Sequence, residues 1–265
     1  MKTALTIAGS DSGAGAGIQA DLKTFAAFGV YGTSAVTALT AQNTTGVTAV
    51  HLVPAEFVTQ QVEAVVSDLG CDAVKTGMLA TAAIVEAVAA AVEALELPNL
   101  VVDPVMVAKG GDRLLEDEAV HAVATVLLRL ARVVTPNVPE AEVLTGQAIR
   151  SRADMREAGQ RLLARGPAAV LVKGGHLPGD EVADVLVTRD HGVVEIVGPR
   201  VPGPNTHGTG CTLAAALAAG LARGASVEDA ARAAREYVAG AMAAGVPLGR
   251  GHRPLGHFWR GILAD

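Results

Sequence analysis

The chain has 265 residues, half of them hydrophobic and only 3% aromatic, with a formal net charge of −6 at pH 7. This length suits one α/β domain, so we expect a single domain over residues 1–265. The negative net charge and the lack of a Lys/Arg run argue against nucleic acid or membrane partners. Two cysteines cannot build a disulfide framework, and this indicates a reducing, cytoplasmic compartment.

Short β-rich runs alternate with longer helical patterns, which is typical of a parallel sheet covered by helices. The first half predicts, in chain order, strand Thr3–Ala8, helix Gly17–Phe28, strand Thr33–Leu39, a polar loop Thr40–Gly46, helix Pro54–Leu69, strand Ala73–Thr76, a helix from the Thr81 cap to Leu95, and strand Leu100–Val102. The second half predicts helix Glu116–Leu130, strand Arg132–Thr135, helices Pro139–Leu144 and Ser151–Arg165, strand Ala169–Val172, a hairpin of Val182–Thr188 and Val193–Val197, and helices Thr209–Ala222 and Ser226–Gly245.

A Gly- and Thr-rich turn, residues 204–212, runs directly into the penultimate helix. The first N–H groups of a helix have no intrahelical partner and lie at the positive end of its dipole, and glycines let a ligand approach the backbone. Such a turn is suited to phosphate or carboxylate. Cys211 falls in the first turn, where the same field lowers a thiol pKa. The alternative is an ordinary helix start with a buried, inert cysteine.

Charged and polar residues follow the expected strands at their C-terminal ends, where open α/β sheets bind ligands. They are Lys75, Asp103, Asn137, Glu140 and Lys173. Each alone is more simply a solvated loop residue, but their shared position at one edge favours a site. Carboxylates, a lysine and a helix N-terminus suit Mg²⁺ and phosphates. The sequence lacks a P-loop motif and zinc-type Cys/His spacing, and its scattered histidines give little support to a Ser-His-Asp triad.

The segment Ser10–Gly17 follows the first expected strand and opens a helix, as a dinucleotide-binding loop would. However, Ile18 stands where the third glycine should fall, and no acidic residue ends the second strand about twenty residues on. A dehydrogenase is therefore a poor interpretation.

Ordered motifs along nearly the whole chain resemble one family. They are Thr6–Asp11, Gly17–Phe25, Thr37–Thr44, Lys75–Leu79, Asp103–Met106, Thr135-Pro136-Asn137-x-x-Glu140, Lys173–His176, Gly208–Cys211 and the end from Gly249 to Phe258. With these motifs the chain resembles the hydroxymethylpyrimidine/phosphomethylpyrimidine kinases of thiamin biosynthesis, within the ribokinase-like superfamily.

The resemblance implies a single-domain, three-layer α/β/α sandwich with a mostly parallel central sheet. It implies an enzyme that uses Mg²⁺ and ATP to phosphorylate the hydroxymethyl group of 4-amino-5-hydroxymethyl-2-methylpyrimidine, and then converts the monophosphate to the diphosphate. It also leads us to expect a homodimer.

The resemblance further assigns residues to each part of the site. The pyrimidine pocket is expected to include Gly9, Asp21, Gln42, Met78 and Val105. Asp103 and Glu140 are expected on the Mg²⁺ side, and the ATP side is expected to include Lys173, Asn137, Thr206, Gly208 and Gly210. The turn Gly208-Thr209-Gly210-Cys211 would be the anion hole. An aminopyrimidine offers both donors and acceptors, which Asp21, Gln42 and backbone groups can match.

Cys211 stands where most members of the superfamily carry an Asp that acts as general base. We hypothesise that Cys211 serves only partly as a base and that the N–H groups contribute more, because phosphoryl transfer depends mostly on positioning and charge stabilisation. Cys71 is expected to pack inertly. Ala14 departs from the family, whose members usually have Gly there, so a positive φ at this position would strain the loop.

Two alternative functions stay open. A pyridoxine/pyridoxal kinase would share the fold and would also phosphorylate a hydroxymethyl group on a six-membered N-heterocycle. A non-catalytic pyrimidine-binding regulator would not need Asp103, Glu140, Lys173 and the glycine turn. The segment Pro178–Asp180 is the candidate for a lid, because Gly and Pro flank it.

Overall fold

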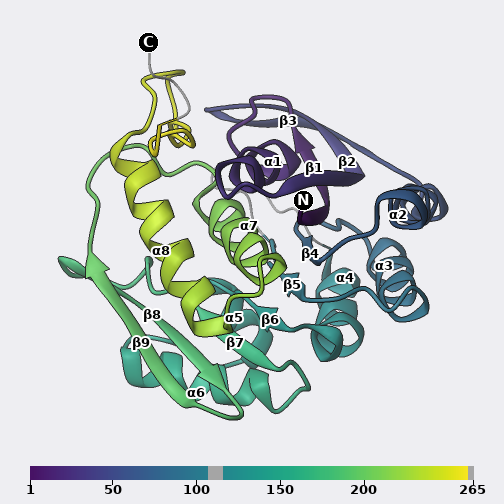
Figure 1. The fold of residues 1–265 in the computed structure, drawn as a ribbon. Coiled ribbons are helices and arrows are strands. Elements are labelled where there is room, and N and C mark those ends of the chain that lie inside the picture. The colour runs from purple at the N-terminus through teal and green to yellow at the C-terminus, as the bar shows by residue number, and fades with distance from the viewer. Residues whose placement is uncertain (107–115, 262–265) are drawn as a thin grey trace.

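A computed structural model describes residues 1–106 and 116–261, and in these residues nine strands form one sheet (Figure 1). The strand order is β3-β2-β1-β4-β5-β6-β7-β8-β9. The strands are β1 Thr3–Asp11, β2 Tyr31–Asn43, β3 Gly46–Leu52, β4 Ala73–Thr76, β5 Leu100–Val102, β6 Val133–Val134, β7 Ala169–Val172, β8 Glu181–Thr188 and β9 Gly192–Pro199. The six strands from β2 to β7 in the sheet pair in parallel, whereas β3 and the hairpin β8–β9 add antiparallel edges.

Helices cover both faces of the sheet. They are α1 Gly17–Ala27, α2 Ala55–Leu69, α3 Ala82–Ala94, α4 Asp117–Ala122, α5 Val138–Thr145, α6 Arg152–Leu163, α7 Thr209–Ala222 and α8 Val227–Ala243. Alternate strand residues point to opposite faces, so Val170 and Val172 of β7 join one core with α2, α3, α5 and α6, while Ala169 and Leu171 join a second core with α1, α7 and α8. The expected three-layer α/β/α sandwich is confirmed.

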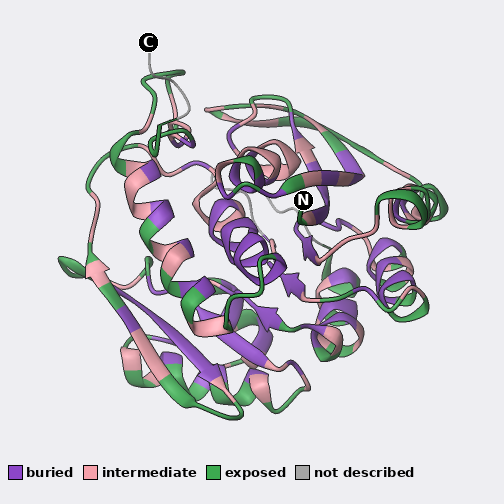
Figure 2. Cartoon of the chain, viewed as in Figure 1, coloured by how far each residue is buried: buried purple, intermediate pink, exposed green. Residues whose placement is uncertain are grey.

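Helix α7 is buried on all sides, and it packs against α1, α8 and the central strands (Figure 2). Small residues let α7 and α8 approach closely. At Gly220 even a methyl group would be too large, because a Cβ there would lie only 2.8 Å from Cβ of Ala230 in α8. This packing fixes the N-terminus of α7 over the sheet.

The prediction of a polar loop at Thr40–Gly46 is wrong. Strand β2 continues to Asn43, turns at Thr44 and Thr45, and returns as the edge strand β3. No sequence pattern marks β3, because most of its residues are exposed and it lacks the hydrophobic alternation of a half-buried strand. Backbone pairing with β2 alone defines it.

The predicted continuous helix Glu116–Leu130 is also revised. Helix α4 ends at Ala122, a π-helical turn covers Val123–Leu127, and a 3₁₀ turn covers Leu128–Leu130. A 3₁₀ turn is common at a helix C-terminus, whereas a π-helical turn is wider and rare. Within the described parts of the chain, no helix combines the length and hydrophobicity needed to cross a lipid bilayer.

The strand order places a topological switch beside β1. Strand β2 lies on one side of β1 and is reached through α1, whereas β4 lies on the other side and is reached through α2. The helices α1 and α2 cover opposite faces of the sheet. Ligands of open α/β sheets bind at the carboxyl ends of strands at such a point. In this chain the ends of β1, β4 and β5 meet there.

Candidate active site

Three of the predicted pyrimidine-pocket residues lie at the ends of β1, β4 and β5. A Cβ on Gly9 would lie 2.5 Å from Cε of Met78, so glycine lets the methionine lie across the end of β1. Val105 is partly exposed and lines a narrow crevice with Thr76 and Gly77. The structure therefore brings Gly9, Met78 and Val105 to one edge of the sheet.

Gln42, the fourth predicted pocket residue, lies further along β2 and is half-buried. Its Oε1 accepts a hydrogen bond from Thr40 Oγ1 at 3.0 Å. Its backbone is fastened to the β1–α1 loop, because Gln42 N donates to Ser12 Oγ at 2.8 Å and Ser12 Oγ donates to Gln42 O at 2.7 Å. The side-chain amide nitrogen faces no partner among these bonds.

Asp21, the fifth predicted pocket residue, lies beneath this edge and is fully buried. Its Oδ2 accepts hydrogen bonds from Thr6 Oγ1 at 2.7 Å and from Lys75 Nζ at 2.8 Å. Burial alone would lower the pKa of Lys75, but Asp21, Cys211 and Asp103 together outweigh it and hold that pKa above its usual value. Asp21 holds the Lys75 ammonium under the site through Oδ2, while its Oδ1 is buried without a hydrogen-bond partner, so its place in the pyrimidine pocket stays a prediction.

A second ion pair joins Asp103, after β5, to Lys173, after β7. Lys173 Nζ donates to Asp103 Oδ1 at 2.7 Å, and Thr135 Oγ1 donates to the same oxygen at 3.2 Å. The other oxygen, Asp103 Oδ2, is buried without a hydrogen-bond partner. A buried carboxylate oxygen that no protein group satisfies is a free acceptor or ligand position.

Asn137 and Glu140 form a capping box at the start of α5. Asn137 Oδ1 accepts from Glu140 N at 2.9 Å, and Glu140 Oε2 accepts from Asn137 N at 2.8 Å. The Asn137 oxygen is thus committed to the helix rather than to a nucleotide. Glu140 Oε2 also lies 4.0 Å from Lys173 Nζ, and burial raises the pKa of Glu140 to about 7 although Lys173 opposes the shift.

The glycine turn brings the first turn of α7 to the Lys173–Asp103 pair. Gly208 has φ +82°, and a Cβ there would lie 1.9 Å from Gly15 O, so no other residue fits. A Cβ on Gly210 would lie 3.4 Å from Lys173 Nζ and 3.7 Å from Asp103 Oδ2. The N–H groups of Thr209, Gly210 and Cys211 have no intrahelical partner. The predicted anion-binding turn is therefore adjacent to a cation and to a free carboxylate oxygen.

Thr206 lies two residues before Gly208, outside the first turn of α7. Its hydroxyl lies 3.4 Å from His252 Nδ1, and its carbonyl accepts from Thr209 Oγ1 at 3.3 Å. Thr206 therefore supports the start of α7 from outside.

Burial raises the pKa of the Cys211 thiol to about 11, although Lys75 opposes the shift and the Gly17 N–H donates to the sulfur. The predicted lowering of this pKa is wrong, because desolvation together with the nearby Asp21 and Asp103 outweighs Lys75 and the Gly17 hydrogen bond. Cys71 packs against the hydrophobic core as expected.

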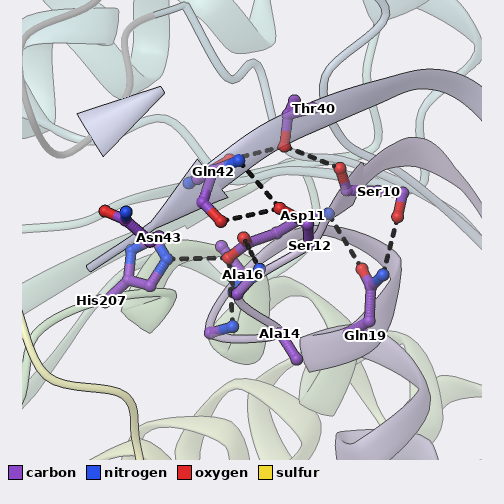
Figure 3. Close-up of polar contacts among 12 residues, drawn as sticks. Ser10, Asp11, Ser12, Ala14, Ala16, Gln19, Thr40, Gln42, Asn43 and His207 are labelled. Atoms are coloured by element: carbon purple, nitrogen blue, oxygen red, sulfur yellow. Dashed lines mark hydrogen bonds and ion pairs between the residues drawn. The ribbon is translucent and has the colours of Figure 1, made fainter. Parts of the chain in front are cut away.

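Sequence reasoning missed Asp11 and His207, which join the β1–α1 loop to the glycine turn (Figure 3). Asp11 is the last residue of β1, and its carboxylate accepts hydrogen bonds from the backbone N–H groups of the loop. This is the pattern of an Asx turn, which is the signal that could have identified it. In the same loop Ala14 has φ +59°, which is the backbone conformation expected to strain a residue other than glycine, and Lys23 Nζ donates to its carbonyl at 2.8 Å.

The segment proposed as a lid is fastened in this structure. Arg200 Nε donates to Gly179 O at 2.6 Å, Nη1 donates to Gly175 O at 3.0 Å, and Nη2 donates to Leu177 O. Nearby, Asp184 Oδ1 accepts from Gly174 N at 2.8 Å. These contacts hold the loop after Lys173 in place, which argues against Pro178–Asp180 as a lid.

Comparison with known proteins gives consistent matches over most of the chain. The family described as phosphomethylpyrimidine kinase matches residues 11–256. A hydroxymethylpyrimidine/phosphomethylpyrimidine kinase of Streptomyces coelicolor is 51% identical over 257 residues, which is 96% of this chain and 94% of that protein. The thiamine biosynthesis bifunctional protein ThiED of Geobacter sulfurreducens is 50% identical over 254 residues, 96% of this chain and 52% of that protein.

Solved structures of two named activities share the fold. The phosphomethylpyrimidine kinase of Clostridium difficile 630 matches with a TM-score of 0.80 at 42% identity, over 90% of this chain and 98% of that one. The pyridoxal kinase of Staphylococcus aureus, in complex with AMP-PCP and pyridoxal, matches with a TM-score of 0.91 at 35% identity, over 99% of this chain and 96% of that one.

Proposed function

The chain belongs to the phosphomethylpyrimidine kinase family and is a phosphotransferase, and from that premise we propose its substrates and the roles of its residues. ATP is the phosphoryl donor. The acceptor is the hydroxymethyl group of 4-amino-5-hydroxymethyl-2-methylpyrimidine, and a second transfer converts the monophosphate to the diphosphate for thiamin biosynthesis.

The observation that carries this proposal is the arrangement around Gly210. The Lys173 ammonium, the free Asp103 oxygen and the N–H groups of the first turn of α7 lie within a few ångströms of one another. Phosphoryl transfer requires positive charge and N–H donors around the transferring group and little covalent chemistry from the protein. A protein that only binds a pyrimidine would not need this arrangement.

The same residues suit a magnesium ion. No group of three or more His, Cys, Asp or Glu side chains in residues 1–106 and 116–261 is placed to hold a metal by itself. Mg²⁺ usually takes one or two carboxylates and completes its shell with water and substrate phosphates. Asp103, through Oδ2, and Glu140 would hold it, and when bound it neutralises charge on the phosphates.

The acceptor binds beside Gly9, Met78, Val105 and Gln42. The apolar side chains of Met78 and Val105 contact the ring, and the Gln42 side chain offers a donor to it. The hydroxymethyl group then points toward the first turn of α7.

Cys211 positions the acceptor hydroxyl and takes little part as a base. A thiol with a pKa of about 11 is protonated at neutral pH, so it can donate or accept a hydrogen bond but rarely removes a proton. The N–H groups of Thr209 and Gly210, with Lys173, carry most of the stabilisation.

One observation favours a second acceptor. The likeness to the Staphylococcus aureus pyridoxal kinase covers nearly the whole of both chains. Pyridoxal also carries a hydroxymethyl group on a six-membered N-heterocycle, so this chain would accept it as a slower, alternative substrate.

The test is ATP-to-ADP turnover with Mg²⁺, with hydroxymethylpyrimidine, its monophosphate and pyridoxal supplied in parallel and the products resolved by mass. Mono- and diphosphate from the pyrimidine, with pyridoxal much slower, support the proposal. Equal or faster turnover of pyridoxal would move the assignment to vitamin B6 salvage. Absence of turnover with all three would refute the kinase function. Lys173→Met should abolish turnover, and Lys2→Met, at an exposed lysine, is the matched control.

We also propose a cytoplasmic homodimer. Both cysteines are free thiols, as in a reducing compartment. Large apolar side chains are exposed around the edge strand β3, on β2, β3 and α2: Leu39, Val50, Leu52 and Phe57. Apolar groups gathered at an open sheet edge commonly mark an interface. Light scattering should give twice the chain mass for the wild type and a monomer for Val50→Asp.

A further inference from the structure

The glycine-rich segment Ser12–Gly17 lies between the two halves of the proposed site. On the pyrimidine side, Ser12 exchanges two hydrogen bonds with the backbone of Gln42 (Figure 3). On the phosphate side, Gly15 lies against His207 and Gly208. Although this segment resembles a dinucleotide-binding loop in sequence, its contacts connect the acceptor pocket to the anion-binding turn.

Asp11 organises this segment with both carboxylate oxygens. Oδ1 accepts from Gly13 N at 2.8 Å, and Oδ2 accepts from Gly15 N at 3.0 Å and Ala16 N at 2.9 Å. The same Oδ2 lies 2.8 Å from His207 Nε2. Burial alone would raise the pKa of Asp11, but the hydrogen bonds from His207, Ala16 and Gly13 outweigh it and hold the pKa below its usual value. An ionised carboxylate only accepts, so Nε2 carries the proton of this bond.

The two loops also interlock sterically. A Cβ on Gly15 would lie 2.1 Å from Cδ2 of His207, and a Cβ on Gly208 would lie 1.9 Å from Gly15 O. The imidazole is buried and directly precedes Gly208, the residue that begins the turn. A movement of either loop therefore displaces the other.

We propose that Asp11 and His207 are positioning residues that lock the Ser12–Gly17 segment to the Gly208 turn, and so fix the acceptor hydroxyl relative to the phosphate bound at α7. This inference rests on the kinase function proposed above. Both side chains bond to the loops rather than to the Lys173–Asp103 pair. A small misplacement of reacting groups costs about 10²-fold in rate, so loss of the lock lowers kcat more than it weakens ATP binding.

The experiment compares variants of His207 in the full chain. His207→Leu removes the donor to Asp11, whereas His207→Gln places an amide nitrogen near the position of Nε2. His191→Gln, at an exposed histidine in the β8–β9 turn, is the matched control. We expect kcat for pyrimidine phosphorylation to fall about 10²-fold in His207→Leu with a nearly unchanged KM for ATP, and to recover in large part in His207→Gln.

The outcomes separate this inference from the proposed function. A wild-type protein without kinase activity refutes the function and, with it, the inference. Wild-type activity with an undiminished kcat in folded His207→Leu, or a loss confined to the KM for ATP, overturns the inference alone. If His207→Leu does not fold, His207→Asn replaces it, because its shorter amide cannot reach Asp11. Equal kcat values for the Gln and Asn variants would then overturn the lock.

Discussion

Gly210→Ala should stabilise the protein and inactivate it. Gly210 lies in the first turn of α7 without a positive φ, so alanine fits the backbone there. The added methyl group would meet Lys173 Nζ at 3.4 Å and Asp103 Oδ2 at 3.7 Å, which are tolerable contacts. Alanine in place of glycine in a helix is worth up to about 1 kcal/mol, and we expect Tm to rise by about 2–4 °C.

Activity should fall because the methyl group occupies the space between the ammonium, the free carboxylate oxygen and the N–H groups. A phosphate oxygen could no longer approach all three. Loss of one such donor costs about 10²–10³-fold in kcat.

The assay pairs thermal unfolding with steady-state kinetics on the pyrimidine. Gly208→Ala is the contrasting variant, because its Cβ would lie 1.9 Å from Gly15 O at φ +82°. The left-handed backbone alone costs about 1–2 kcal/mol, so this variant should unfold at a lower temperature. A Gly210→Ala protein that keeps wild-type kcat would refute the placement of phosphate at this turn, and one that loses stability would refute the fit of alanine in the first turn of α7.

Three further predictions concern single side chains. Ala14→Gly relieves a positive φ of 59° and should raise the free energy of unfolding by about 1 kcal/mol in urea titrations; an unchanged midpoint would contradict this, because the bond from Lys23 to the carbonyl of residue 14 is present in both proteins. Cys211→Ala should keep more than about a thousandth of wild-type kcat, because a thiol with a pKa of about 11 is a poor base at neutral pH; a larger loss, or a pH–rate limb between pH 6 and 9 that the variant lacks, would contradict this. Burial, with a smaller contribution from Lys23, lowers the pKa of His257 from 6.5 to about 4. The unfolded chain therefore binds this proton first as pH falls, and about 3 kcal/mol of stability should be lost between pH 6.5 and 4. His257→Gln should make the free energy of unfolding less dependent on pH across this range. An equally steep pH dependence in the variant would exclude His257 as the source.

The pyrimidine and phosphate sides of the site differ in how far local sequence could define them. Asp103 and Lys173 could be identified because each directly follows an expected strand, and Glu140 because it lies in the short helix that follows the next one; parallel strands bring their carboxyl ends to one edge. Asp21 could be located on its helix, but its burial could not be predicted, because that depends on Lys75 reaching it from β4. The sequence predicts Asn137 on the ATP side, and only the structure shows that its Oδ1 accepts a hydrogen bond from the backbone N–H of Glu140 in its own helix.

The sequence by itself determined the alternation of strands and helices, the single sheet, and the start of α7 at Thr209, because hydrophobic periodicity, caps and glycines act over a few residues. Tertiary structure alone decided three features. Strand β3 exists only through backbone pairing with β2. Burial and the nearby Asp21 and Asp103 raise the pKa of the Cys211 thiol, although the residue lies in the first turn of α7. The bond from His207 to Asp11 joins residues 196 positions apart, and such a contact depends on packing that no local pattern encodes.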